Sequence, residues 1–302
     1  MGDGQRDQRV TVVVITRNRR AELLRTLAKL AALPEQPGVI VVDNGSADGT
    51  AAAVVRAHPG VSLIASRRNL GATGRNLALR RVSTPYVAFC DDDTWWDAGS
   101  LALAADALDA HCDVAAVMGR IIVEPSGSED PIVPELATSP VRGRPGLPGP
   151  ALMSIMAGAS VLRADAFRRV GGFSPRLWLG GEEELLAADL VCTGYALCYL
   201  SGAIIHHQAS FQRDAASRRM LGIRNTLWFT WLRRPLASAL KRTADLAWSV
   251  PRDRVAAQAY WAAIRGLPWV LRERRPVPPG VEAQIRLLDE PRRTSAARRY
   301  VS

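Results

Sequence analysis

The stretch Tyr86-Val87-Ala88-Phe89-Cys90-Asp91-Asp92-Asp93 is the part of the sequence from which the fold can be inferred. A short apolar run, typical of a buried strand, is followed at once by three consecutive carboxylates. Adjacent anions repel one another and resist burial, so this position favours a bound cation. Carboxylate oxygens suit hard divalent ions such as Mg²⁺ or Mn²⁺, which commonly hold substrate phosphates. A solvated acidic loop is the alternative interpretation of the triplet.

Three strand-like apolar runs precede this stretch, and each is followed by a turn and a helical pattern. The runs are residues 10–15, 39–42 and 61–65. Strand and helix thus alternate four times, which predicts a parallel, three-layer α/β sheet. Because the carboxyl ends of parallel strands share one edge, where ligands bind, we expect the residues at the four strand ends to meet in one crevice. These residues are Thr16, Asp43, Ser66 and Asp91.

The composition is that of a globular protein, with 302 residues, 48% of them hydrophobic and 23% charged. The length allows one large domain or two smaller ones. The four cysteines have no C-x-x-C spacing, which favours buried thiols in a reducing compartment over disulfides or a zinc site. Residues 1–9 are polar, and no apolar run approaches the roughly 18 residues of a membrane span, so a cytoplasmic location is expected.

The positive charge is concentrated in the last third of the chain. Residues 1–205 hold 20 basic and 22 acidic side chains, whereas residues 206–302 hold 19 and 7. We therefore divide the chain into a catalytic domain, residues 1–205, and a basic helical extension, residues 206–302. Trp and Arg alternate in this extension, which is typical of helix packing, of a surface on an anionic membrane, or of a dimer contact. The Pro- and Arg-rich end from residue 272 is expected to be loosely ordered.

Five motifs in this order make the chain resemble a family 2 glycosyltransferase of the GT-A fold over about residues 10–207. They are Thr16-Arg17-Asn18-Arg19, residues 41–50, residues 69–76, Asp91-Asp92-Asp93 and Gly181-Glu182-Glu183. The resemblance implies a Rossmann-type, mostly parallel central sheet flanked by helices. It also implies a metal-dependent, inverting transfer of a sugar from a nucleotide-diphosphate sugar to a hydroxyl acceptor, with Mg²⁺ or Mn²⁺ as cofactor. The helical extension lies outside the shared pattern.

The resemblance also implies roles for individual residues. The nucleotide-binding residues would be Thr16, Arg17, Asn18, Asp43, Asn44, Arg75, Asp91 and Asp92. The metal ligands would be Asp91, Asp93 and His207. Glu183 would be the catalytic base, with Glu182 beside it. The family usually has Glu-Asp where this chain has three glutamates, so Glu182, Glu183 and Glu184 all stay candidates for the base.

Three tryptophans, Trp95, Trp96 and Trp178, are predicted acceptor contacts because an indole ring can stack on a sugar; core packing is the alternative. Two other functions are compatible with parts of the sequence. A sugar nucleotidyltransferase would carry a glycine-rich loop after the first strand, and residues 16–19 contain no glycine. A non-catalytic binding protein could instead use the basic extension on nucleic acid or membrane, but the intact acidic motifs weigh against it. We expect no nucleic-acid partner, and a peripheral contact with the inner face of the membrane.

Overall fold

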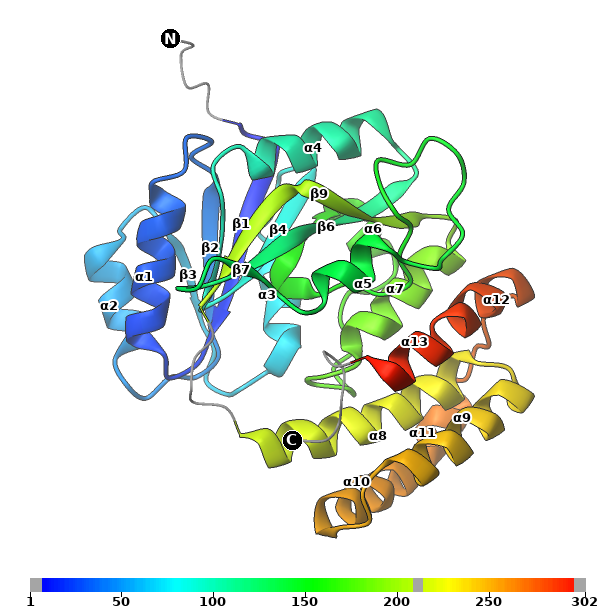
Figure 1. Cartoon of the computed structure of the whole chain (residues 1–302). Coiled ribbons are helices and arrows are strands. Elements are labelled where there is room, and N and C mark those ends of the chain that lie inside the picture. The colour runs from blue at the N-terminus through cyan, green and yellow to red at the C-terminus, as the bar shows by residue number, and fades with distance from the viewer. Residues whose placement is uncertain (1–6, 209–213, 296–302) are drawn as a thin grey trace.

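The computed structural model describes residues 7–208 and 214–295, in which one sheet is flanked by helices and followed by a helical extension (Figure 1). The polar residues 1–9, which contribute to the expected cytoplasmic location, are described only from residue 7 onward. The strands are β1 (Val10–Thr16), β2 (Gly38–Asp43), β3 (Ser62–Ala65), β4 (Tyr86–Asp91), β5 (Thr94–Trp96), β6 (Val114–Val123), β7 (Ser128–Glu129), β8 (Ser160–Arg163) and β9 (Ala196–His207). They form a sheet in the order β3-β2-β1-β4-β8-β6-β9-β5, with β7 paired to β6.

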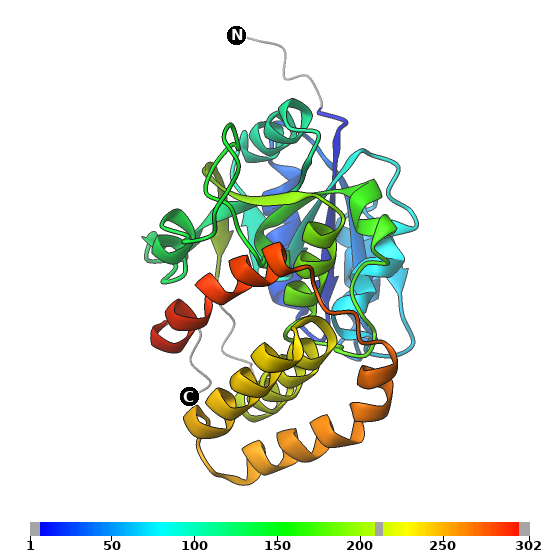
Figure 2. The same ribbon diagram turned by 90° about the vertical axis from the view of Figure 1, so that its right-hand side faces the viewer.

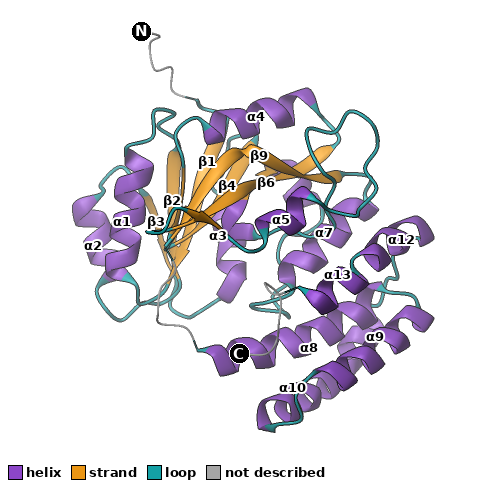
Figure 3. Cartoon of the chain, in the orientation of Figure 1, coloured by secondary structure: helices purple, strands orange, loops and turns teal. Residues whose placement is uncertain are grey.

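Helices cover the sheet and build the extension, as the colouring by element type shows (Figure 3). Around the sheet lie α1 (Arg20–Ala31), α2 (Thr50–Ala57), α3 (Gly74–Leu79), α4 (Ser100–Ala110), α5 (Val133–Ala137), α6 (Ala164–Arg169) and α7 (Glu182–Cys192). The extension comprises α8 (Ala215–Arg233), α9 (Leu236–Ser249), α10 (Arg254–Arg265), α11 (Leu267–Arg272), α12 (Pro279–Leu287) and α13 (Asp289–Thr294). In the described residues no helix combines the length and the hydropathy that crossing a bilayer requires.

The parallel part of the sheet is the part that the sequence predicts. Strands β3, β2, β1 and β4 are parallel neighbours. The central strand β1 is fully buried at Val12, Val13 and Val14, as expected for β-branched residues in a strand covered on both faces. Register places Thr16 beside Asp43, and Ile15 beside Asp91. The predicted convergence of the strand ends at one edge is therefore confirmed.

The other part of the sheet is mixed and brings later segments to the same edge. Strand β8 pairs antiparallel with β4, and β9 runs parallel to β6. The short strand β5, directly after the acidic triplet, pairs antiparallel with β9, so that Thr94 lies opposite His207. The triplet and the end of β9 are thereby held together, although more than a hundred residues separate them. The predicted mostly parallel α/β sheet with flanking helices is confirmed.

The extension packs against α7 through a shared apolar cluster, to which α7 contributes Leu185 and Ala188. Figure 2 shows the helices of the extension below the sheet. Helix α8 supplies Ile223, Leu227 and Trp228, which belong to the same buried cluster as residues of α9 and α10. The Trp228 Nε1 donates to the Ala263 carbonyl at 3.0 Å. The prediction that the chain is loosely ordered from residue 272 onward is wrong for residues 279–294, because these form α12 and α13. Residues 296–302 lie outside the described part. The division at residue 205 stays a prediction.

A buried ion cluster fastens α12 and α13 to the end of α8. The Arg234 side chain is only 2% exposed. Its Nη2 donates to Glu282 Oε1 at 2.8 Å and its Nη1 to Asp289 Oδ1 at 2.7 Å. Glu282 is itself buried. Removing one partner of such a cluster leaves an uncompensated charge that water cannot reach.

We therefore expect Arg234→Leu to lower the free energy of unfolding by about 3–5 kcal/mol, because Glu282 then stays buried without its cation. Chemical denaturation followed by circular dichroism measures the change. The control is Lys241→Leu, which removes an exposed cation from α9 and should change the free energy of unfolding by less than about 0.5 kcal/mol. Equal effects of the two substitutions would contradict a structural role for the cluster.

Candidate active site

A cleft of about 450 Å³ opens at the carboxyl edge of β1 and β4. It is lined by side chains from the sheet edge, from the start of α7 and from α8. The charged and polar residues among them are Thr16, Arg17, Arg19, Asn44, Arg75, Asp91, Asp92, Asp93, Glu182, Glu183 and Arg218. Most of the residues that the sequence singles out thus lie around one cavity, which contains five acidic and four basic side chains.

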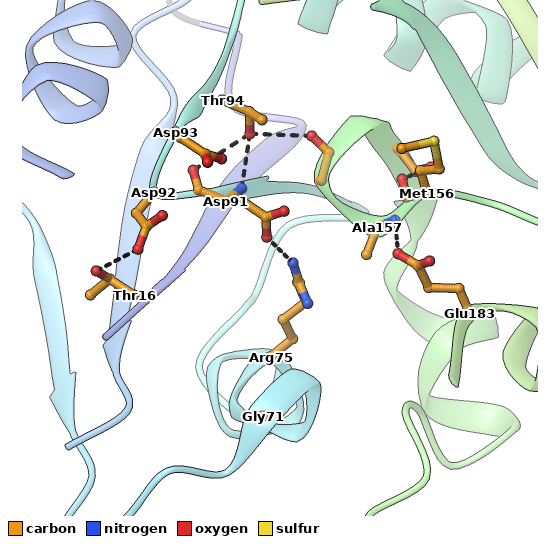
Figure 4. A network of polar contacts seen from close by, with 12 residues as sticks. Thr16, Gly71, Arg75, Asp91, Asp92, Asp93, Thr94, Met156, Ala157 and Glu183 are labelled. Atoms are coloured by element: carbon orange, nitrogen blue, oxygen red, sulfur yellow. Dashed lines mark hydrogen bonds and ion pairs between the residues drawn. The ribbon is translucent and has the colours of Figure 1, made fainter. Parts of the chain in front are cut away.

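The middle carboxylate of the triplet is buried and fully engaged. Asp92 is 4% exposed and accepts a hydrogen bond from Thr16 Oγ1 at 2.9 Å (Figure 4). It also accepts a hydrogen bond from Arg19 Nη1 at 2.9 Å. Burial raises the pKa of Asp92 to about 7, against the opposing effect of the Arg19 guanidinium. Asp92 therefore ties the end of β1 to the end of β4 and shapes the floor of the cleft.

The first carboxylate of the triplet rests on a buried arginine. Arg75 is 3% exposed, and its Nη2 donates to Asp91 Oδ1 at 2.5 Å. The guanidinium lies over the rings of Phe89 and Phe173, which fixes its position. The Asp91 side chain stays 46% exposed to the cleft. On its other side the carboxylate lies close to Gly158, where a Cβ would lie 2.9 Å from Asp91 Oδ2 and would push the carboxylate aside.

The third carboxylate faces the end of β9. Asp93 Oδ2 lies 3.3 Å from Arg19 Nη1, and Asp93 Oδ1 lies 3.9 Å from His207 Nε2. Ligands of one octahedral Mg²⁺ or Mn²⁺ are separated by about 3 Å when adjacent and about 4 Å when opposite, so this pair fits a shared ion. In residues 7–208 and 214–295 no three His, Cys, Asp or Glu side chains form a cation site by themselves. A cation here would thus take its remaining ligands from water and substrate phosphates.

Helix α7 brings its acidic first turn to the opposite wall. Gly180 and Gly181 both have positive φ and form the turn that precedes the helix. Glu182 is 4% exposed, and its Oε2 has no hydrogen-bond partner. The Ala157 backbone N–H donates to Glu183 Oε1 at 2.5 Å. Burial, reinforced by the negative charge of Glu182, raises the pKa of Glu183 to about 8. Glu184 does not line the cleft.

Figure 4 shows how these groups are arranged, with Asp91 between Asp92 on one side and Glu183 on the other. One wall of the cleft therefore carries a carboxylate cluster paired with arginines, and the other carries an acid with a raised pKa. A divalent cation with a diphosphate can be held at the first wall. A proton acceptor lies at the second wall. This arrangement of the two walls suits group transfer onto a hydroxyl.

Two predicted nucleotide-binding residues make structural contacts. Asp43 is 3% exposed, and its Oδ1 accepts the Ser46 backbone N–H at 2.9 Å. Asn18 accepts the Ala47 backbone N–H at 2.8 Å through Oδ1, while its own N–H donates to Ser46 Oγ. Asp43 thus stabilises the β2–α2 turn from within, and Asn18 holds this turn against the segment that follows β1. Their contact with a nucleotide stays a prediction.

The three predicted acceptor contacts have different surroundings, and Trp178 lies beside Gly71, which lines the cleft. The prediction that Trp96 contacts the acceptor is wrong, because its side chain is 1% exposed and belongs to the main hydrophobic core. Trp95 stacks on His206 with ring centroids 5.4 Å apart, and it lines a separate cleft of about 560 Å³. The Trp178 carbonyl accepts the Ala72 N–H at 2.8 Å, so this residue connects the turn before α3 to the turn before α7. None of the three lines the cleft that holds the carboxylates.

Sequence reasoning missed what the extension contributes to the site. Asn225 of α8 is fully buried, and its Nδ2 donates to the carbonyls of Leu177 at 2.9 Å, Leu179 at 3.0 Å and Gly180. These carbonyls belong to the loop that leads directly into α7 and its glutamates. Arg218, at the start of α8, lines the cleft itself. A lone amide in an amphipathic helix gives no signal of this role in the sequence.

Comparisons with known proteins show which proteins the chain resembles. The family model described as Glycosyl transferase family 2 matches residues 11–171. An N-acetylglucosaminyl-diphospho-decaprenol L-rhamnosyltransferase of Mycobacterium tuberculosis is 28% identical over 277 residues, covering 78% of this chain and 90% of that protein. A pre-mycofactocin glycosyltransferase of the same organism is 34% identical over 229 residues, covering 72% of this chain and 46% of that protein.

Solved structures support the fold at low sequence identity. A mannosyltransferase from Pyrobaculum calidifontis, solved in complex with GDP-Man and Mn²⁺, has a TM-score of 0.58 and 20% identity. The similarity covers 94% of this chain and 87% of that one. The chain is thus similar in fold to a transferase crystallised with a nucleotide sugar and a divalent metal.

Proposed function

Because this chain belongs to glycosyl transferase family 2, we propose that it is a metal-dependent, inverting enzyme that moves a sugar from a nucleotide-diphosphate sugar to an acceptor hydroxyl. The observation that carries the proposal is the cleft itself, in which a carboxylate cluster and an acid with a raised pKa face one another. Inversion requires that the acceptor attack from the face opposite the leaving group, so the group that binds the diphosphate and the base must lie on different sides of the sugar. The carboxylate cluster and Glu183 lie on different walls of this cleft, which supports such a reaction.

The donor diphosphate would lie against the β1–β4 edge. Asp93 and His207 would hold the divalent ion together with water and the donor phosphates, and the ion would stabilise the charge of the departing diphosphate. The third predicted ligand, Asp91, forms no three-residue cation site with them in the described residues, so it would contact the ion only through water or after the donor binds. Arg75 keeps Asp91 in place from below, and Arg19 keeps Asp93 in place from the side. Thr16, Arg17 and Asn44 would contact the nucleotide from the neighbouring strand ends, with Asp43 and Asn18 shaping the turn that meets the base.

Glu183 would accept the proton of the attacking hydroxyl. A free glutamate is a weak base at neutral pH, but a pKa near 8 makes Glu183 a far better proton acceptor once it is deprotonated. Its Oε1 is fixed by the Ala157 N–H, which orients the carboxylate. Glu182 would act through its charge, which raises the pKa of its neighbour. The general-base role of Glu183, rather than of Glu182 or Glu184, is part of the proposal.

For the substrates we propose a hexose or deoxysugar donor and an acceptor that carries phosphate. The rhamnosyltransferase relative is named for an acceptor that is a sugar on a diphospho-lipid. In this chain Arg218 brings the basic extension to the cleft beside the carboxylates. A cation at that place would attract an anionic acceptor such as a lipid-linked diphosphate sugar.

A thermal-shift screen of nucleoside diphosphates and sugar nucleotides, with and without Mn²⁺, tests the proposal. A ligand that binds only the folded state increases the free energy of unfolding, by about 2.7 kcal/mol at a ligand concentration of a hundred times its Kd. The melting temperature rises as a result. We expect one nucleotide to stabilise the protein and Mn²⁺ to increase that stabilisation. Asp93→Asn should abolish the Mn²⁺ increment, whereas Asp165→Asn, an exposed carboxylate of α6, should leave it unchanged. Protection by no nucleotide would contradict the proposed function.

A further inference from the structure

Several large apolar side chains of the extension face solvent. Trp248 at the end of α9 is 87% exposed, and Trp261 and Ile264 of α10 are 63% and 56% exposed. Leu236 and Leu240 of α9 are 61% and 60% exposed. Figures 1 and 2 place α10 at the outer side of the extension, with α8 between it and the sheet. Large apolar groups gathered on an outer face mark a contact surface.

The spacing on α10 separates a buried side from an exposed side. Ala256, Ala259 and Ala263 are buried and belong to the apolar cluster that contains the α8 residues. Trp261 and Ile264, three residues apart, share the exposed side. Helix α10 is thus amphipathic in an unusual sense. Ala256, Ala259 and Ala263 pack inward, whereas the large side chains of Trp261 and Ile264 point away from the protein.

Cations accompany the exposed apolar side chains. Arg252, Arg254 and Arg265 are exposed at the start and the end of α10. Across residues 236–272 there are six basic and two acidic residues. One of the two acids, Asp253, accepts Arg219 Nη1 at 2.6 Å and is therefore already neutralised. We call Trp248, Trp261, Ile264, Arg252, Arg254 and Arg265 the α9–α10 surface.

We propose that the α9–α10 surface docks the enzyme onto an anionic lipid membrane. Tryptophan and arginine favour the boundary between acyl chains and headgroups, where the indole ring is half apolar and the cation meets lipid phosphate. Anionic headgroups attract each basic residue near the surface, so charge and apolar contact add up. The proposed contact is a peripheral one, in which the exposed side chains of α9 and α10 enter the headgroup region.

A second copy of this chain suits the surface less well than a membrane. A symmetric dimer places the same patch of both copies together, so the cations of one copy would meet those of the other. Like charges facing each other across an interface oppose association. An anionic membrane has the complementary charge and can accept both tryptophans at once.

Cosedimentation with lipid vesicles tests the proposal without any glycosyl donor, so its outcome is independent of the enzyme's activity. We expect the full chain to bind mixed phosphatidylcholine–phosphatidylglycerol vesicles at least about tenfold more tightly than pure phosphatidylcholine vesicles. The double variant Trp261→Ser/Ile264→Ser should weaken binding at least about tenfold. Arg254→Gln/Arg265→Gln should remove most of the preference for the anionic vesicles.

The control is Val55→Ser on α2, which removes an exposed apolar side chain from the other end of the molecule and should leave vesicle binding unchanged. Nucleotide-dependent thermal stabilisation of each variant shows that the cleft is still folded. Equal binding to both vesicle types, no binding to either, or an effect of Val55→Ser as large as that of the double variant would overturn the proposal. A wild-type dimer in light scattering that the Trp261→Ser/Ile264→Ser variant converts to monomer would assign the surface to a second copy instead.

Discussion

Glu183→Gln is expected to lower the turnover number at least about a hundredfold while leaving the affinity for the nucleotide sugar nearly unchanged. The substitution keeps the size of the side chain, and an amide oxygen can still accept the Ala157 N–H. It removes the group that accepts the proton of the acceptor hydroxyl. The turnover number comes from a coupled assay for released nucleoside diphosphate, and the affinity from titration calorimetry. Near-normal turnover would remove Glu183 from the role of base.

The pH dependence of the same variant separates catalysis from folding. The base must be deprotonated, and its pKa is raised to about 8, so kcat/KM of the wild type should rise with pH up to about 8 and then level off. In Glu183→Gln this rise should disappear. Stability should respond in the opposite direction, because the folded protein holds a proton that the unfolded chain releases above its ordinary pKa of 4.5. The stability of the wild type should fall as pH rises from about 5 through 8, and less so in the variant.

Asn225→Ala is expected to lower the turnover number about tenfold to a hundredfold, with the affinity for the donor nucleotide changed less than about threefold. The amide supports the carbonyls of Leu177, Leu179 and Gly180, immediately before the glutamates of α7. Without it the loop loses its fixed position, and Glu183 moves relative to the donor. Asn225 is thus a positioning residue, because it acts through the loop and not on the substrate.

A general loss of stability could imitate this effect, so the control must destabilise the same part of the protein. Arg234→Leu does so, because it breaks the ion cluster at the other end of α8 without touching the loop. Per folded molecule, Arg234→Leu should keep its turnover and Asn225→Ala should not. A second readout is the pH profile. The apparent pKa of the base should shift in Asn225→Ala and stay in place in Arg234→Leu. Equal losses in both variants would contradict the positioning role.

Much of the catalytic edge could be predicted from local pattern. Residues 10–15 and 86–90 are continuous apolar runs, and such runs form strands buried on both faces. The acidic triplet follows one of them directly. Once the alternation of strands and helices indicates a parallel sheet, the direction of the chain places every strand end on the same edge. For this reason Thr16, Asp43 and Asp91 lie at the predicted edge.

The environment of each aromatic residue could not be predicted in this way. Trp96 and Trp228 are buried, whereas Trp248 and Trp261 face solvent. The local sequence does not separate the two pairs, because the buried Trp96 lies between aspartates while the exposed Trp261 lies in a largely apolar stretch. An indole ring is large and amphipathic, so it suits a core, a binding site and a surface equally well. Which of these it occupies depends on the element that packs against it.

The sequence by itself determined the parallel strands, the common edge at which their carboxyl ends lie, and the chemistry of the carboxylates at that edge. Each of these follows from neighbouring residues and chain direction. Only the tertiary structure decided that Asn225 holds a loop 48 residues away, and that Glu183 stands opposite Asp91. It also decided that α10 turns its large side chains outward. These features depend on which surfaces of distant helices and loops pack together. That packing is set by the fit of many side chains at once, and no local pattern encodes it.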